Sequence, residues 1–209
     1  MTQRDREPHD RSHGDPAVAV VVPIRSFAGA KSRLAPVLDA DARADLARRM
    51  ADRVVDAAGS LPVVVVSSAP EVTAWAAGRG LAVVADPGTL DGAADAGRDW
   101  ARARGCGRVV VAHGDLPRAV SLDAVATDAD TAVAVIVPDR RDDGTPVLSV
   151  PTASAFRFAY GPQSAARHTA EAERCGLEVR LVRDPALAFD VDVPADYAAL
   201  RDLTDEPVA

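Results

Sequence analysis

The sequence of 209 residues has no asparagine, a single lysine, two cysteines and few aromatic side chains. Two cysteines cannot form a disulfide framework, so Cys106 and Cys175 are interpreted as reduced thiols in a cytoplasmic protein. No apolar run approaches the roughly 20 residues that a membrane-spanning helix needs. Because aromatic residues make up only 4% of the chain, the core must be built from valine, leucine, isoleucine and alanine.

The charge balance is acidic, with a formal net charge of -7 and an isoelectric point near 5.1. This argues against a nucleic-acid-binding surface, which needs a basic face. Residues 1–16 are polar, carry both signs of charge and lack the apolar core of a signal peptide. They are predicted to form a disordered tail before a single domain over residues 17–205.

The basic residues are unevenly chosen, because Lys31 is the only lysine among 24 lysines and arginines. Together with the absence of asparagine, this usage indicates a GC-rich coding bias under which lysine drifts to arginine wherever either residue serves. A lysine that is retained against this bias marks a position where the longer, forked guanidinium does not serve.

Valine-rich runs separated by helical patterns set the predicted fold. The predicted buried strands are residues 17–22, 63–66, 81–84, 109–112 and 131–137, and the helices between them are residues 41–58, 70–77 and 92–104. Beyond residue 137 strands and helices no longer alternate regularly. Strands are predicted over 147–150 and 177–182, and helices over 164–175 and 194–203. The pattern indicates one Rossmann-like α/β domain with a mostly parallel, mixed sheet.

Ligands of such sheets bind beyond the carboxyl ends of the strands, so the loops that follow the strands hold the candidate site. The first loop carries Arg25, Lys31 and Arg33, which together suit a polyphosphate. It lacks the glycine spacing of a Walker A loop and of a dinucleotide fingerprint. A solvated basic loop is the alternative, and the lone lysine favours a phosphate site.

Acidic residues follow two other predicted strands. Asp115 lies directly after a buried strand, and Asp190 and Asp192 precede the last predicted helix. Carboxylates at this edge of a sheet are suited to hold Mg²⁺ against a nucleotide. The alternative is that Asp115 caps a turn before Pro117.

Hydroxyl groups near the start of a predicted helix form a third candidate binding site. Thr145 and Ser164 suit an anion site, although two ordinary turns and an N-cap serine are the favoured explanation when these residues are taken alone. His168 is interpreted as a partly exposed helix residue. His113, beside Asp115, is a weak metal signal.

Six segments in order resemble a known family; they are VPIRSFAGAKSRLAP, DPGTLDGA, DLP, VPDRRDDGT, FRFAYGPQSAARH and DVDVPADY. They resemble the CofC-type guanylyltransferases of coenzyme F420 biosynthesis, within the MobA-like nucleotidyltransferases, over about residues 18–200. The resemblance implies a three-layer α/β/α domain of the nucleotide-diphospho-sugar transferase type. It implies that GMP passes from GTP to a phosphorylated three-carbon acid, with Mg²⁺ as cofactor and release of pyrophosphate.

The resemblance also assigns residues. The nucleotide-binding set is Arg25, Lys31, Arg33, Gly88 and Asp91, with Lys31 and Asp115 as the catalytic pair. The metal ligands are Asp115, Asp190 and Asp192. The acid-binding residues are Thr145, Gly161 and Ser164.

The chain departs from the family pattern at four points: TLD replaces GLN at residues 89–91, GTP replaces GTN at 144–146, GPQS replaces GPGS at 161–164, and His113 fills a usually acidic position. These departures leave open a related enzyme with another nucleotide or acceptor, or a non-catalytic GTP-binding relative. Phosphoenolpyruvate is the favoured acceptor over 2-phospho-L-lactate and 3-phosphoglycerate, on lineage alone. A homodimer is one option for the assembly, and neither nucleic acid nor membrane is an expected partner.

Overall fold

The computed structural model describes residues 18–126 and 132–204. The predicted tail over residues 1–16 lies outside the described residues. The elements follow one another in a list: β1 (Val18–Pro23), the short 3-10 helix η1 (Ser32–Leu34), α1 (Ala40–Ala57), β2 (Val63–Val66), α2 (Pro70–Gly78), β3 (Ala82–Val84), α3 (Leu90–Arg102), β4 (Arg108–Ala112), β5 (Val133–Val137), β6 (Val147–Pro151), α4 (Ser164–Arg174), β7 (Glu178–Leu181) and α5 (Pro194–Thr204).

Seven strands form one sheet in the order β3-β2-β1-β4-β6-β5-β7. The β1, β2, β3 and β4 strands run parallel, and β7 pairs in parallel with β5. Strand β6 is antiparallel to both of its neighbours, β4 and β5. The predicted mostly parallel, mixed sheet is confirmed, and β6 supplies its antiparallel character.

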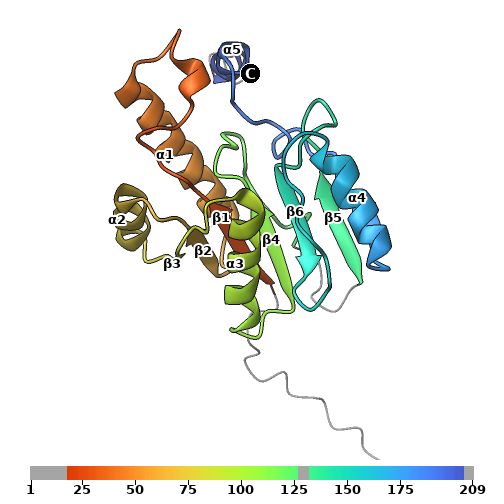
Figure 1. The fold of residues 1–209 in the computed structure, drawn as a ribbon. Helices are drawn as coiled ribbons and strands as arrows, with labels where there is room; N and C mark the ends of the chain where they lie inside the picture. The colour runs from red at the N-terminus through yellow and green to blue at the C-terminus, as the bar shows by residue number, and fades with distance from the viewer. Residues whose placement is uncertain (1–17, 127–131, 205–209) are drawn as a thin grey trace, which may run out of the picture.

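Alternate residues of each strand enter two separate cores on opposite faces of the sheet. Val20 and Val22 of β1 belong to the core that packs against α1 and α2. Ala19 and Val21 of the same strand belong to the core that packs against α3 and α4. Figure 1 shows α3 and α4 together on one face. The predicted three-layer α/β/α architecture is therefore confirmed, because helices bury both faces of a sheet whose strands are apolar on both sides.

Helix α3 approaches the sheet closely. At Gly97 an added Cβ would lie 2.2 Å from Cγ1 of Val21, so only glycine allows this packing distance. The helix begins where Thr89 accepts a hydrogen bond from the Gly92 amide at 3.1 Å, a side-chain N-cap. Together these contacts fix the first turn of α3 over the carboxyl ends of β1 and β4, at the edge where the candidate site lies.

The predicted helices and strands match the observed bounds to within two residues. Among the described residues, no helix combines the length and the apolarity that crossing a membrane requires.

Candidate active site

A pocket of about 710 Å³ opens at the carboxyl ends of β1 and β4. Its walls come from the loop after β1, the first turn of α3, the segment after β4 and Asp192 before α5. Of the residues predicted from the sequence, it gathers Arg25, Lys31, Arg33, Asp115 and Asp192. We call this cavity the cation pocket. The predicted convergence of loops at one edge of the sheet is confirmed for these five residues.

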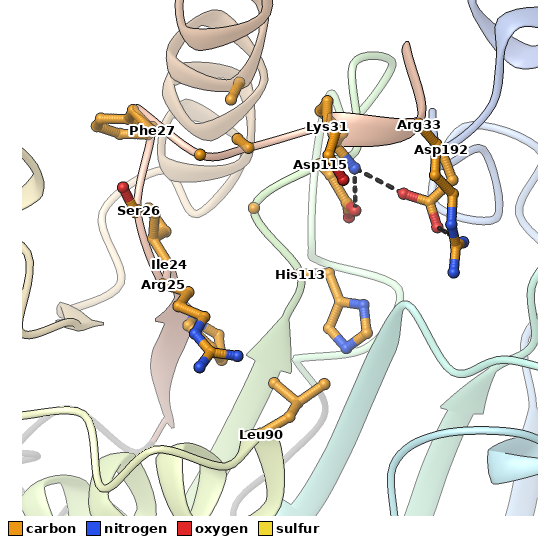
Figure 2. A pocket seen from close by; sticks show the side chains of 16 residues that line it. Ile24, Arg25, Ser26, Phe27, Lys31, Arg33, Leu90, His113, Asp115 and Asp192 are labelled. Carbon is orange, nitrogen blue, oxygen red and sulfur yellow. Dashed lines mark hydrogen bonds and ion pairs between the residues drawn. The ribbon is translucent and has the colours of Figure 1, made fainter. Parts of the chain in front are cut away.

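The ammonium group of Lys31 lies between two carboxylates at the top of the pocket (Figure 2). Its Nζ is 2.6 Å from Oδ2 of Asp115 and 2.9 Å from Oδ1 of Asp192. Only 9% of the Lys31 side chain is exposed. Burial opposes its charge, yet the two carboxylates outweigh burial and hold the pKa of Lys31 above its usual value. The same ammonium outweighs burial at Asp115 and lowers the pKa of that carboxyl.

The backbone at Lys31 is in the left-handed region, with φ at 53°. This conformation is uncommon for residues other than glycine and costs on the order of 1 kcal/mol. The first loop is nevertheless held in place by Glu71 of α2, which accepts hydrogen bonds from the Ser26 hydroxyl at 2.6 Å and the Phe27 amide at 3.2 Å. The loop therefore presents Lys31 to the carboxylates as a fixed, strained element.

The two arginines of the first loop, Arg25 and Arg33, make different contacts. The guanidinium of Arg33 is 74% exposed and lies 3.9 Å from Oδ2 of Asp192. Arg25 lies in the lower part of the pocket in Figure 2, near His113 and Leu90. Both guanidinium groups can move without leaving a buried pair, which suits side chains that close on an incoming polyphosphate.

His113 lines the pocket although its sequence signal was weak. Its Nε2 atom is buried and has no hydrogen-bond partner among the described residues. Its ring centroid is 5.3 Å from that of Tyr160, and burial lowers the pKa of the imidazole. The His113 amide donates to the Pro146 carbonyl at 2.9 Å, which links the pocket to the loop that carries Thr145.

The predicted metal ligands are only partly assembled. Among the described residues, no three histidine, cysteine or acidic side chains form a group that could hold a metal ion. Lys31 lies between Asp115 and Asp192 instead. However, Oδ1 of Asp115 is buried and has no hydrogen-bond partner within residues 18–126 and 132–204. Burial and the charges of Asp115 and Asp192 raise the pKa of Asp190, whose Oδ1 lies 3.9 Å from the Arg140 guanidinium and which is not among the residues that line the cation pocket. This Asp115 oxygen is a hard donor of the kind that divalent cations bind.

Gly88 and Asp91, predicted to bind the nucleotide, are not among the residues that line the cation pocket, although their neighbour Leu90 is. The Gly88 amide donates to the Asp86 carboxylate at 2.8 Å. Oδ1 of Asp91 accepts a hydrogen bond from the Tyr160 amide at 2.7 Å. Asp91 therefore connects α3 to the loop before α4, a role that its position in the sequence did not indicate.

Thr145 and Ser164 are not among the residues that line the cation pocket; each is 2% exposed, and their hydroxyl oxygens are 3.1 Å apart. His168 is fully buried, so its interpretation as a partly exposed helix residue is wrong. Its Nδ1 is 3.1 Å from Oγ1 of Thr145, and its ring centroid is 4.8 Å from that of Tyr160. The sequence correctly placed His168 in a helix, but it did not show that this side chain faces the sheet. We call Thr145, Ser164 and His168 the hydroxyl cluster.

Helix α4 begins differently from the N-cap serine that the sequence suggested. Its N-cap is Gln163, which has φ at 58° and makes no side-chain capping hydrogen bond. This is the position at which the family pattern has glycine, and the left-handed backbone explains that preference. Gly161, predicted to bind the acid, has φ at 110°, and an added Cβ would lie 3.3 Å from the Arg167 guanidinium.

Two residues that sequence reasoning missed hold the site loops. Glu71 fixes the first loop, and its carboxylate gave no signal beyond that of an ordinary acid in a first helical turn. Asp196 is 4% exposed and accepts hydrogen bonds from the amides of Asp192 and Val193, both at 3.0 Å. It lies three residues after Val193 at the start of α5, a spacing typical of a helix cap, so the sequence contained a usable signal.

Comparison with known proteins agrees with this geometry. The family model described as "Guanylyl transferase CofC like" matches residues 18–201. A phosphoenolpyruvate guanylyltransferase from Rubrobacter xylanophilus is 38% identical over 192 residues, covering 88% of this chain and 94% of that protein. One from Sphaerobacter thermophilus is 37% identical over 187 residues, covering 86% of this chain and 90% of that protein.

One further relative is named for a different acceptor, and one solved structure has a similar fold. A 3-phospho-D-glycerate guanylyltransferase from Phenylobacterium zucineum is 34% identical over 187 residues, covering 84% of this chain and 86% of that protein. A structure from Desulfovibrio desulfuricans G20, described as a nucleotide-diphospho-sugar transferase, superposes with a TM-score of 0.73 at 18% identity. The match covers 91% of this chain and 88% of that one, and it supports the fold alone.

Proposed function

The chain belongs to the family of CofC-like guanylyl transferases, and on that premise we propose that it transfers GMP from GTP to the phosphate of phosphoenolpyruvate. Pyrophosphate is the second product, and the reaction serves coenzyme F420 biosynthesis. The observation that carries the proposal is the cation pocket, where Lys31, Arg25 and Arg33 surround a space that also contains Asp115 and Asp192. An anionic triphosphate and a cation-binding carboxylate pair are both accommodated there.

The transfer is an in-line substitution at the α-phosphorus of GTP. A phosphate oxygen of the acceptor forms the new P–O bond, and the bond to the bridging oxygen of the β-phosphate breaks with its electron pair. The acceptor oxygen is already ionised, so no proton has to be removed and no general base is required. The protein contributes position and charge neutralisation, as in other phosphoryl transfers.

The pocket residues have separate roles in this step. Lys31 and Arg25 neutralise the pyrophosphate as its negative charge grows, and the exposed Arg33 guanidinium closes over the triphosphate. Charge stabilisation of this kind, aimed at where charge develops, is worth several kcal/mol in known enzymes. Because Lys31 is held by Asp115 and Asp192 before any nucleotide arrives, its ammonium is already placed at the site where that charge develops.

We propose that Asp115, Asp190 and Asp192 hold Mg²⁺. When bound, this ion supplies Lewis-acid neutralisation of the phosphate oxygens. The buried Asp115 oxygen, which has no hydrogen-bond partner among the described residues, supports this assignment. Lys31 then acts as a counter-ion that occupies part of the same carboxylate set.

We further propose that the acceptor is phosphoenolpyruvate rather than 3-phosphoglycerate or 2-phospho-L-lactate, and that the enzyme works in the cytoplasm, where Cys106 and Cys175 stay reduced. The names of the relatives support the first proposal. The second rests on free cysteines and on a charge balance that suits no nucleic-acid or membrane surface. A homodimer is one option for the assembly.

The proposal is tested by offering the purified chain GTP, Mg²⁺ and each of the three acids in turn. We expect pyrophosphate release with phosphoenolpyruvate and a GMP adduct of its mass. A parallel panel with ATP, CTP and UTP tests the nucleotide. An adduct with another acid would correct the acceptor, an adduct with CTP alone would correct the nucleotide, and GTP binding without any pyrophosphate would indicate a non-catalytic relative.

A further inference from the structure

His168 has a defined proton arrangement. It is the fifth residue of α4, it is fully buried, and its Nε2 lies 3.0 Å from the amide nitrogen of Ala159. A backbone amide can only donate, so Nε2 accepts and carries no proton. Burial, followed by the nearby Arg167 charge, lowers the pKa of His168 to about 4, so the ring is neutral at pH 7. Its single ring proton is therefore on Nδ1.

This proton fixes the polarity of the hydroxyl cluster. Nδ1 of His168 donates to Oγ1 of Thr145 at 3.1 Å, and the Thr145 oxygen forms the next hydrogen bond, with Oγ of Ser164, also at 3.1 Å. Three protons can be donated, one from the ring and one from each hydroxyl, but only two hydrogen bonds use them. Whichever hydroxyl donates within the pair, one hydroxyl proton has no acceptor in residues 18–126 and 132–204.

An uncommitted proton on a buried hydroxyl is unfavourable. Both side chains are 2% exposed, and a buried polar group without a partner costs about 1–3 kcal/mol. A ligand oxygen that only accepts, such as one of a carboxylate or a phosphate, would satisfy this proton. A neutral donor suits such a group because it adds no charge beside the carboxylates of the cation pocket.

The cluster lies next to the cation pocket, although none of its three residues is among those that line it. The Tyr160 ring is between the His168 ring and the His113 ring, with centroid distances of 4.8 Å and 5.3 Å. The His113 amide also donates to the Pro146 carbonyl, one residue after Thr145. His168 thus ties the loop of Ala159 to the loop of Thr145, beside the pocket residue His113.

We propose that His168 is a positioning residue, which holds the Thr145–Ser164 pair so that one hydroxyl donates to an anionic oxygen of the acceptor acid. This inference rests on the proposed function and assigns His168 to the acceptor rather than to GTP. It touches neither the reacting phosphorus nor the leaving group. Its loss therefore weakens acceptor binding and leaves the triphosphate contacts intact.

The test compares His168→Leu with His168→Gln. A glutamine amide can accept from Ala159 through its oxygen and donate to Thr145 through its nitrogen, whereas leucine can do neither. We expect His168→Leu to raise KM for phosphoenolpyruvate about tenfold to hundredfold, as loss of one ordered hydrogen bond would. KM for GTP should change by less than about twofold, and His168→Gln should recover most of the loss.

Two further variants show whether His168 acts through the hydroxyls. Thr145→Val removes the acceptor of the His168 proton, so adding His168→Leu to it should raise KM for phosphoenolpyruvate little further. Thr169→Val is the matched control: it removes a hydroxyl from the same helix, bonded at 2.9 Å to the Ala165 carbonyl and outside the cluster. It should leave both KM values unchanged.

The proposal is overturned if His168→Leu leaves KM for phosphoenolpyruvate unchanged, if it raises KM for GTP equally, or if His168→Gln is no better than His168→Leu. Should His168→Leu fail to fold, ¹⁵N NMR of the wild-type ring decides, because a proton on Nε2 contradicts the arrangement. If the wild-type chain forms no GMP adduct with any acid, the proposed function fails separately. The tautomer, and calorimetric binding of phosphoenolpyruvate to wild type, His168→Leu and His168→Gln, then still decide the role of His168.

Discussion

The cation pocket and the hydroxyl cluster lie side by side but hold their side chains in opposite ways. In the cation pocket, Lys31 is fixed by full charges, and Asp192 remains 42% exposed. In the hydroxyl cluster, Thr145, Ser164 and His168 are almost fully buried and neutral, and they are fixed by hydrogen bonds alone.

The difference separates two tasks of a nucleotidyl transfer. A triphosphate and its leaving group need charge neutralisation, which an open, ionic pocket supplies and which tolerates movement. An acceptor needs orientation, which rigid, neutral donors supply without competing for the carboxylates that are proposed to bind Mg²⁺. Variants that break one region should therefore disturb GTP and acceptor unequally.

The largest effect is expected at Asp115, which anchors Lys31 and is proposed to hold the metal. Asp115→Ala removes both functions and should lower turnover about a thousandfold or more, as loss of preorganised charge does. Steady-state pyrophosphate release measures it. Asp45→Ala, which breaks an exposed ion pair with Arg48 on α1, is the control and should have normal activity. Near-normal turnover of a folded Asp115→Ala would remove Asp115 from the site.

The next largest effect is expected for Lys31→Arg, which keeps the charge. A guanidinium is larger and planar, and the side chain here is only 9% exposed with Nζ within 3 Å of two carboxylates. We expect turnover to fall about a hundredfold, with the fold intact by circular dichroism. Activity equal to that of wild type would show that any cationic side chain at position 31 supports turnover. The retention of a single lysine there would then have no functional meaning.

The burial of His168 in the hydroxyl cluster should make the free energy of unfolding depend on pH. The folded pKa of His168, about 4, lies below the usual 6.5, so the unfolded chain binds the proton more tightly. The stability that comes from keeping the His168 ring neutral is fully present above pH 6.5 and is lost as the pH falls towards 4. It amounts to roughly 2 kcal/mol between pH 8 and pH 5. Urea unfolding of wild type should lose about this much more stability over that range than His168→Gln. An equal loss in both would contradict a buried neutral ring.

A smaller effect is expected at Asp91, the contact between α3 and the acceptor side. Asp91→Ala leaves the Tyr160 amide without its acceptor and should raise KM for the acceptor about tenfold. Asp91→Asn keeps an accepting oxygen and should stay close to wild type. If KM for GTP rises instead, Asp91 binds the nucleotide directly, as the family resemblance implies.

Most of the fold was predictable because its strands are short valine runs and its helices have clear ends. What could not be predicted is that β6 lies between β4 and β5 and runs antiparallel to both. Strand order depends on long-range pairing, and a run such as residues 147–150 carries no direction. The close approach of α3 at Gly97 likewise depends on Val21, 76 positions earlier in the sequence.

Part of the site was predictable for the same reason. Residues that directly follow parallel strands meet at one edge, so Lys31 and Asp115 were placed together from the sequence. The hydroxyl cluster was not, because which face of α4 is buried is decided by the neighbouring loop. His168 has its partners on residues 145 and 159, and neither contact leaves a periodic pattern.

Hydrogen–deuterium exchange of the wild-type chain tests most directly whether the two regions serve different ligands. An α,β-methylene analogue of GTP, which cannot transfer its nucleotide, is added first with Mg²⁺, and phosphoenolpyruvate second. We predict slower exchange in residues 24–34 and 113–116 with the analogue alone. Slower exchange in residues 144–145 and 159–168 should follow only after the acid is added. Protection of the second set by the analogue alone, with no further change on adding the acid, would contradict the division.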